Sequence, residues 1–240
     1  MIPQTVPHSP LLDVQSRFES FIQTIPGYEN IDALMQAMPP DQRHRADYLL
    51  MNRRFIVEQK VLLVEPAKSP QAFVQRLLRE RRLFVTGKTT TRRVFDSLPD
   101  GKALERKMLL GMTKNFEDRI DLADEQARDT RQIFGIPDAL AIVVILNQSA
   151  RTLHPELLRY GLSHLLSRTA RDGSPRYPHN DGFLVISASH SLMDDGGAGM
   201  PVFADISQTC RSVPDTVAFL DSLVGEWSRY NGLPIKRYEH

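Results

Sequence analysis

Apolar side chains in the first forty residues recur at helical spacing. In residues 16–25 they lie three or four positions apart, which predicts a helix that ends at Pro26. Residues 30–38 predict a second, shorter helix with Asn30 as its N-cap. Two apolar runs follow, at 48–51 and 55–57, and the two residues between them predict a β-hairpin.

The rest of the chain alternates helical patterns with buried strands. Helices are predicted at 69–82, 102–134, 154–168 and 212–232, the second being one long amphipathic helix or a helix pair. Continuous apolar runs at 139–146 and 182–189 are short and bounded, which is typical of strands buried on both faces. The stretch "MDDGGAGMP", residues 193–201, is predicted to be a loop.

The order of these elements predicts one α/β domain over residues 1–240. A strand, a helix and another strand in succession imply a parallel crossover. We expect three layers, with a mixed central sheet between helices, a long helical insertion and a C-terminal helix. The core is expected over about 16–190, and residues 191–240 are expected to add a loop and that last helix.

Composition is that of a globular protein. The chain has 240 residues, of which 41% are hydrophobic and 25% charged, so it can bury a sizeable core. Its single cysteine, Cys210, excludes an internal disulfide and a cysteine-rich zinc site, and fits a reducing compartment. No apolar run approaches about 18 residues and the N-terminus lacks a signal-peptide pattern, so we expect a cytoplasmic protein without a membrane span.

Charge is near neutral overall but uneven along the chain. The formal net charge of +1 makes no strong demand for a polyanionic partner. In residues 75–93, however, Arg and Lys far outnumber the lone Glu80. This stretch is either a solvated helix face with a loop or a surface for phosphates, and in the second case Lys88, Arg92 and Arg93 are candidate nucleic-acid contacts.

The predicted hairpin carries charges where burial is expensive. With a two-residue loop at 52–53, counting back along both strands places Asp47 directly opposite Glu58. Opposed strand residues have Cβ atoms about 4.5 to 5.5 Å apart, a spacing that two carboxylates resist unless a cation lies between them. Lys60 lies two residues beyond Glu58 and therefore points to the same face. Two such carboxylates suit a magnesium-type ion that takes its other ligands from water and phosphate.

At these positions the chain resembles the PD-(D/E)xK nuclease superfamily. The motif of that superfamily is an acidic residue on one strand, followed on the next by an acidic residue, a spacer and Lys. Here it reads Asp47, then Glu58-Gln59-Lys60, with Ala46 where the superfamily name has Pro. The order of elements over about 16–190 also resembles the restriction-endonuclease-like core of that superfamily.

The resemblance implies roles for the matching positions. Asp47 and Glu58 are expected to bind Mg²⁺ or Mn²⁺, and Lys60 to orient the attacking water and steady charge on the phosphate. Many members also use a carboxylate from the first helix, for which Glu19 is the candidate and Glu29 the alternative. A polar residue on a later helix is frequent too, and Gln126 is the possible match.

Two other motifs fail on their spacing. "VTGKTTT", residues 85–91, lacks the glycine that a P-loop needs five positions before Gly87. The set around Ser189 and His190 has no G-x-S-x-G turn, so we interpret it as a solvated loop.

The sequence thus favours a magnesium-dependent nuclease, with DNA expected over RNA and a homodimer left open. A catalytically silent module of the same fold, binding nucleic acid or a protein partner, is the alternative, and a hydrolase of small phosphate esters is a third. The non-catalytic interpretation of the hairpin charges is a surface salt bridge worth under about 1 kcal/mol.

Overall fold

The computed structural model describes residues 13–38, 43–63, 70–84, 91–190, 192–194, 197–232 and 235–237. Its helices are α1 Val14–Ile22, α2 Ile31–Gln36, α3 Pro70–Glu80, α4 Thr91–Asp96, α5 Gly101–Phe134, α6 Pro155–Leu166 and α7 Val213–Asn231. Its strands are β1 Glu29–Asn30, β2 Tyr48–Leu50, β3 Phe55–Leu62, β4 Leu140–Asn147, β5 Gly182–Ser187, β6 Leu192–Asp194, β7 Gly197–Ile206 and β8 Ile235–Arg237. All the helices expected from the sequence are present, and α5 is one continuous helix rather than a pair.

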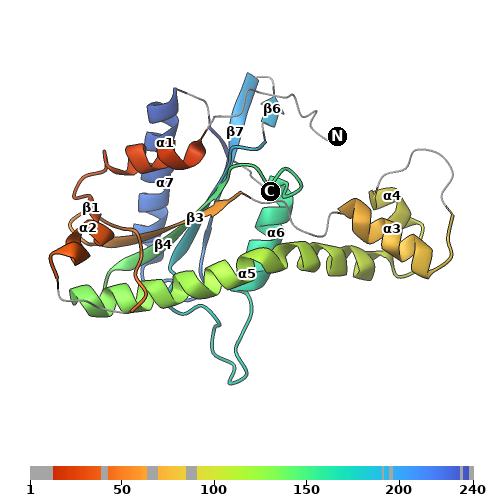
Figure 1. The fold of residues 1–240 in the computed structure, drawn as a ribbon, viewed down its shortest axis with the longest axis horizontal. Helices are drawn as coiled ribbons and strands as arrows, with labels where there is room; N and C mark the ends of the chain where they lie inside the picture. Colours follow the sequence, from red (N-terminus) through yellow and green to blue (C-terminus); the bar gives the residue numbers. More distant parts are fainter. Residues whose placement is uncertain are drawn as a thin grey trace.

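The strands form a mixed open sheet in the order β1-β2-β3-β4-β5-β7, and the short strands β6 and β8 both pair with β7 (Figure 1). β3, β4 and β5 run parallel to one another, whereas β1 and β2 are antiparallel to their neighbours. The chain passes from β3 to β4 through α3, α4 and α5, and from β4 to β5 through α6. The predicted parallel crossover is therefore confirmed.

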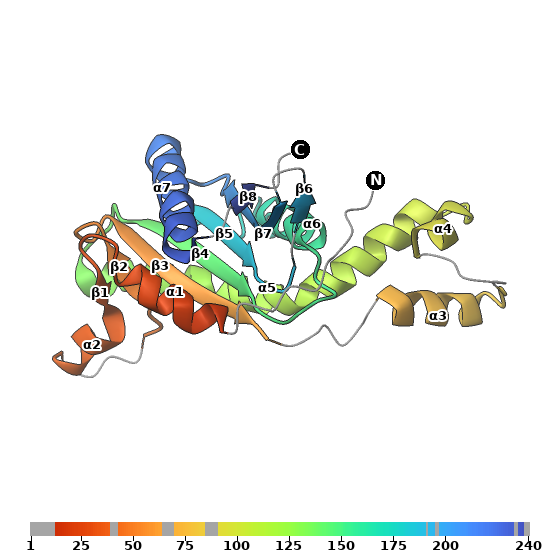
Figure 2. The same ribbon diagram turned by 90° about the horizontal axis from the view of Figure 1, so that it is seen from above.

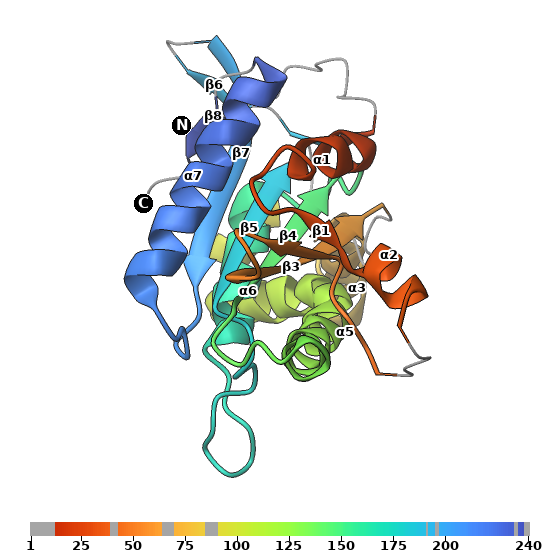
Figure 3. The same cartoon turned by 90° about the vertical axis from the view of Figure 1, so that its left-hand side faces the viewer.

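Helices cover both faces of the sheet and give three layers (Figure 3). Side chains of α1 and α7 pack on one face, where the rings of Phe21 and Trp227 meet edge to face with centroids 5.2 Å apart. Side chains of α5 and α6 pack on the other face against Val143 and Phe183. All eight residues of β4 are buried because neither of its faces meets water, which explains why this strand shows no alternation in the sequence.

The C-terminal part of the core differs from the prediction. Residues 193–201 were expected to be a loop, and this expectation is wrong: β6 and the first half of β7 pair antiparallel here, with Leu192 opposite Gly199. β7 continues beside β5 to Ile206, so the sheet extends past the expected core boundary at 190. Glycines and Pro201 hide the strand pattern in the sequence, but pairing with β5 and burial of Val202 and Phe203 outweigh their weak strand propensity.

A buried ion pair ties the last turn of α5 to the sheet. The guanidinium of Arg131 donates to the carboxylate of Asp181 at 2.8 Å and to the carbonyl of Ala139 at 2.8 Å. The same Asp181 carboxylate accepts from the backbone N–H of Ala141 at 2.7 Å. These contacts fix the C-terminal half of α5 across the starts of β4 and β5.

The first half of α5 extends beyond the sheet together with α3 and α4 (Figures 1 and 2). We call residues 70–84 and 91–111 the arm. Inside the arm, Phe73 and Phe95 contact edge to face at 6.3 Å, and Arg81 forms an ion pair with Asp100 at the start of α5. Among the helices of the described residues, none is both long and apolar enough to cross a membrane.

Candidate active site

The hairpin forms in the register expected from the sequence. Tyr48 pairs with Val57 and Leu50 with Phe55, so Asp47 and Glu58 stand opposite each other. Asn52 and Arg53 have positive φ, as a turn of the primed type requires, and the Arg54 N–H donates to the Met51 carbonyl at 3.3 Å. Met51 has positive φ too, so strand pairing ends at Leu50 and Phe55, one residue earlier than expected. The backbone N–H of Gln59 donates to Asp47 Oδ2 at 2.7 Å, which holds the Asp47 carboxylate against β3.

Lys60 lies on the same face as Glu58 and joins it to α5. Its ammonium donates to Glu58 Oε1 and, at 2.8 Å, to Gln126 Oε1. The side chains of Lys60 and Glu58 are only 12% and 5% exposed. The alternative of a surface salt bridge is therefore wrong, because this pair is buried and its energetics are those of desolvated charges.

Gln126 also fixes the segment that leads into Asp47. Its side-chain amide donates to the carbonyl of Arg45 at 2.6 Å, while its oxygen accepts from Lys60. One turn further along α5, the hydroxyl of Thr130 accepts from the backbone N–H of Ala46 at 2.9 Å. A single helix thus positions both the lysine and the strand that carries the first acid.

Glu19 approaches from α1, on the opposite face of the sheet. Its carboxylate accepts from the side-chain amide of Gln15 at 2.8 Å and from that of Gln59 at 3.4 Å. Gln59, which the sequence motif treats as a spacer, therefore contacts Asp47 through its backbone and Glu19 through its side chain. Glu29, the alternative to Glu19, is held in an ion pair with Arg53 at 2.7 Å beside the hairpin loop.

Burial and mutual repulsion perturb both acids of the hairpin. Burial, followed by the charge of Asp47, raises the pKa of Glu58 to about 8, against the opposing effect of Lys60. Burial also raises the pKa of Asp47, although the Gln59 N–H and Lys60 oppose the shift and the charge of Glu19 adds to it. Both carboxyl groups therefore resist ionisation unless more positive charge is supplied.

The donor set fits a hard divalent cation that keeps other ligands. Glu58 Oε2 is buried without a hydrogen-bond partner, and Asp47 stands opposite it. A cation between the two acids would supply the missing partner and offset the repulsion that raises both pKa values. Among the described residues no group of three or more His, Cys, Asp or Glu side chains could share a metal ion, so the remaining ligands would be water and phosphate, as Mg²⁺ prefers.

Two of the candidate nucleic-acid contacts, Arg92 and Arg93, lie in the arm, away from this cluster. Arg93 is exposed on α4, and Arg92 precedes it on the same helix. Lys88 lies outside the described residues. The structure therefore places part of this basic stretch on a projecting element but does not join it to the acids.

A second polar cluster surrounds His190. The ring of His190 accepts from the hydroxyls of Ser187 and Ser189, each at 2.9 Å, when its Nε2 donates to the carbonyl of Arg151 at 3.0 Å.

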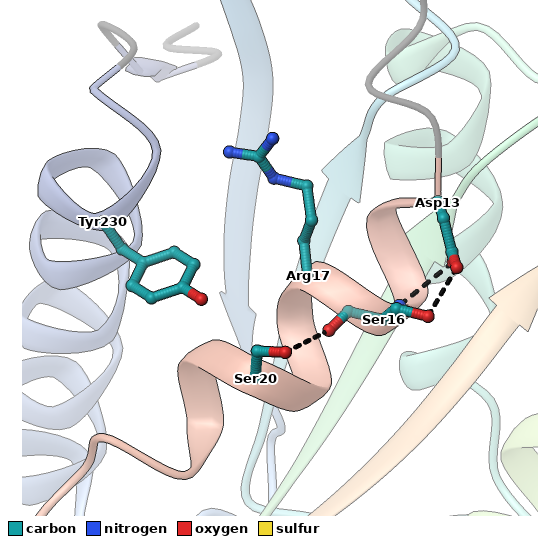
Figure 4. A pocket seen from close by; sticks show the side chains of 5 residues that line it. All are labelled: Asp13, Ser16, Arg17, Ser20 and Tyr230. Carbon is teal, nitrogen blue, oxygen red and sulfur yellow. Dashed lines mark hydrogen bonds between the residues drawn. The ribbon is translucent and has the colours of Figure 1, made fainter.

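A pocket of about 370 Å³ between α1 and α7 is lined by polar groups (Figure 4). In it Ser16 donates to Asp13 and Ser20 to the carbonyl of Ser16, which are local helix contacts. In the part of the chain that the structure describes, neither of these two groups of residues contacts Lys60 or the two acids of the hairpin.

Comparison of the chain with protein-family models, with characterised proteins and with solved structures finds no match. The function must therefore be argued from the residues themselves.

Glu58 predicts how stability depends on pH in the absence of metal. Its pKa is raised from the ordinary 4.5 to about 8, so the folded protein binds this proton more tightly than the unfolded chain does. The resulting stabilisation is fully present below the unfolded pKa and is lost as pH rises through the folded pKa. We expect the free energy of unfolding, measured with denaturant in EDTA, to fall between about pH 5 and pH 8.

Glu58→Gln removes this titration and should flatten the pH dependence between about pH 6 and pH 8, above the Asp124 pKa, which burial raises to about 6. Asp118→Asn, at an exposed acid on α5, is the control. In saturating Mn²⁺ the wild-type trend should reverse, since metal binding requires ionised acids. A metal-free protein whose stability rises over this range, or a Glu58→Gln variant with an unchanged slope, would contradict the assignment.

Proposed function

We propose that this protein is a metal-dependent nuclease that hydrolyses phosphodiester bonds, with DNA expected over RNA. The observation that carries the proposal is the convergence of Asp47, Glu58, Lys60 and Gln126 on one end of the hairpin. Two opposed acids with raised pKa values, one of them with an unpartnered oxygen, lie beside a buried ammonium. Perturbed acids around a positioned cation are typical of a catalytic site.

The order of elements supports the proposal. From α1 to β5 the order is a helix, a short strand, the short helix α2, two antiparallel strands, three helices, a parallel strand, a helix and a further parallel strand. This order resembles the restriction-endonuclease-like core, in which the residues corresponding to Asp47 and Glu58-Gln59-Lys60 stand on adjacent strands. Here β3 carries Glu58-Gln59-Lys60, and Asp47 directly precedes its hairpin partner β2.

Each residue has a role that its surroundings favour. Asp47 and Glu58 would hold Mg²⁺ or Mn²⁺, which when bound lowers the pKa of water and stabilises charge on phosphate. Lys60 would donate to the attacking water or to a phosphate oxygen, because its ammonium is already aimed into the site. Gln126 keeps that ammonium in place through its 2.8 Å hydrogen bond, and Glu19 orients Gln59 from the other face.

One observation favours the alternative of a catalytically silent module. The Lys60 ammonium already binds Glu58 Oε1, so the pair partly compensates its own charges without a metal. In a silent module this pair would be structural, and nucleic acid or a protein would bind elsewhere on the same fold.

A substrate panel tests the proposal. Single-stranded, double-stranded and hairpin DNA and RNA would be incubated with Mn²⁺, in parallel with a small phosphodiester and with the Glu58→Ala variant. We expect cleavage of at least one nucleic acid by the wild type and none by the variant. Hydrolysis of the small ester alone would assign a different substrate class, and cleavage that survives Glu58→Ala would place the chemistry elsewhere.

A further inference from the structure

The near-neutral chain is divided into a basic and an acidic part. Nine of its 30 Lys and Arg residues, but only four of its 29 Asp and Glu residues, lie in the arm, residues 70–84 and 91–111. The arm therefore has a formal charge of +5 and the rest of the chain a charge of −4. A polyanion would therefore be attracted more strongly to the arm than to the rest of the chain.

Exposed cations line both long helices of the arm. Arg76 and Arg79 are exposed on α3, and Lys102, Arg106 and Lys107 are exposed on α5. The structure pairs Arg76 with Glu80, but within the described part of the chain it gives no ion pair to the three α5 cations. Lys102 and Arg106 are four residues apart and hence lie on one face of the helix.

α5 links this surface rigidly to the candidate active site. The helix runs unbroken from Gly101 to Phe134 and carries both Arg106 and Gln126, the residue that holds Lys60. At a rise of about 1.5 Å per residue, Lys102 and Arg106 lie about 30 to 36 Å along the axis from Gln126. That separation is close to one turn of B-form DNA, about 34 Å or 10 base pairs.

We propose that the arm binds the phosphate backbone of a nucleic-acid duplex about one helical turn away from the bond at Lys60. The substrate class is thus an extended duplex rather than a short oligonucleotide. This inference rests on the proposed function for the position of the scissile bond, but binding by the arm does not require catalysis. β3 supports the arrangement because its C-terminal end points toward the arm (Figures 1 and 2).

Equilibrium binding without turnover tests the arm. Fluorescence anisotropy in EDTA would compare labelled duplexes of about 8 and about 30 base pairs over a range of salt. The arm variant is Lys102→Gln with Arg106→Gln. The matched control is Arg171→Gln with Arg229→Gln, which removes two exposed cations from the loop after α6 and from α7. Circular dichroism would verify that both variants are folded.

We expect the wild type to bind the longer duplex at least tenfold more tightly than the shorter one. The arm variant should lose most of this advantage, and its log-log salt slope should fall by about 2, one for each lost phosphate contact. The control should change neither quantity.

Three outcomes would overturn the inference. The two variants could have equal log-log salt slopes, the binding could be independent of duplex length, or single strands could bind more tightly than duplexes. An arm variant that dissolves a dimer while the wild type binds no duplex would assign the arm to the acidic surface of a second copy instead. This experiment measures binding and the substrate panel measures cleavage, so the two proposals can fail separately. Duplex binding by the arm without cleavage in the panel would indicate a silent module. Cleavage without binding by the arm would reject the role of the arm and leave the nuclease proposal intact.

Discussion

Lys60→Met is expected to lower turnover about 100-fold or more while leaving Mn²⁺ binding at least as strong as in the wild type. The variant keeps most of the apolar stem of the side chain and deletes the ammonium that contacts Glu58 and Gln126. The loss in rate is the scale expected when one positioned electrostatic donor is removed. Metal binding should persist because both acids remain and a competing cation is gone. Single-turnover cleavage and isothermal titration with Mn²⁺ measure the two quantities separately.

Two further variants keep this prediction sharp. Arg119→Met removes a cation on α5 that donates to the carbonyl of Val61 at 2.7 Å, and it should leave turnover within a few-fold of wild type. Lys60→Gln keeps a hydrogen-bond donor for Glu58 if the Met variant proves unstable, and should lose turnover as Lys60→Met does. Activity near the wild-type level in either Lys60 variant would mean that the chemistry lies elsewhere in the chain.

Asp47→Asn is expected to abolish metal-dependent cleavage while leaving the metal-free protein as stable as the wild type or more stable. Burial is the main cause of the raised pKa of Glu58, and the substitution deletes the second cause, the charge of Asp47, and so relieves repulsion between two buried acids. An Asn oxygen can still accept the hydrogen bond that Asp47 accepts from the Gln59 N–H, so β2 and β3 should remain in register. Denaturant unfolding in EDTA and the cleavage assay report the two effects.

The control for this substitution is Asp118→Asn, an exposed position on α5, which should change neither stability nor cleavage. Unchanged cleavage by Asp47→Asn would reject the assignment of the first acid. A strongly destabilised metal-free variant would show that Asp47 stabilises the hairpin and is not a metal ligand.

The pH dependence, the substitutions at Lys60 and Asp47, and the salt dependence of the arm address different parts of the molecule. The first three depend on the hairpin acids and their neighbours, whereas the fourth depends on cations about 30 Å away along α5. A nuclease is supported by all four, whereas a silent duplex-binding module would show only the metal-free pH dependence and the salt dependence.

Local sequence patterns predicted most of the helices and strands and also the juxtaposition of Asp47 and Glu58. The turn at Asn52-Arg53 permits only a short loop, and the two-residue period of strands then places Asp47 opposite Glu58 and Lys60 on the same face. Helical spacing identified α1, α5 and α7, and a continuous apolar run identified β4, because each pattern repeats within a few residues. The sequence by itself therefore predicted the acids and the lysine of the candidate site.

Contacts between distant segments were decided by the tertiary structure. The bond between Lys60 and Gln126 joins residues 66 positions apart, and nothing in the spacing of α5 selects Gln126 over its polar neighbours. Burial of the Glu58–Lys60 pair depends on α5 covering that face of the sheet, and β7 forms a strand because β5 offers it an edge. Propensity and periodicity act over a few residues, whereas desolvation and strand pairing depend on what the rest of the chain packs against.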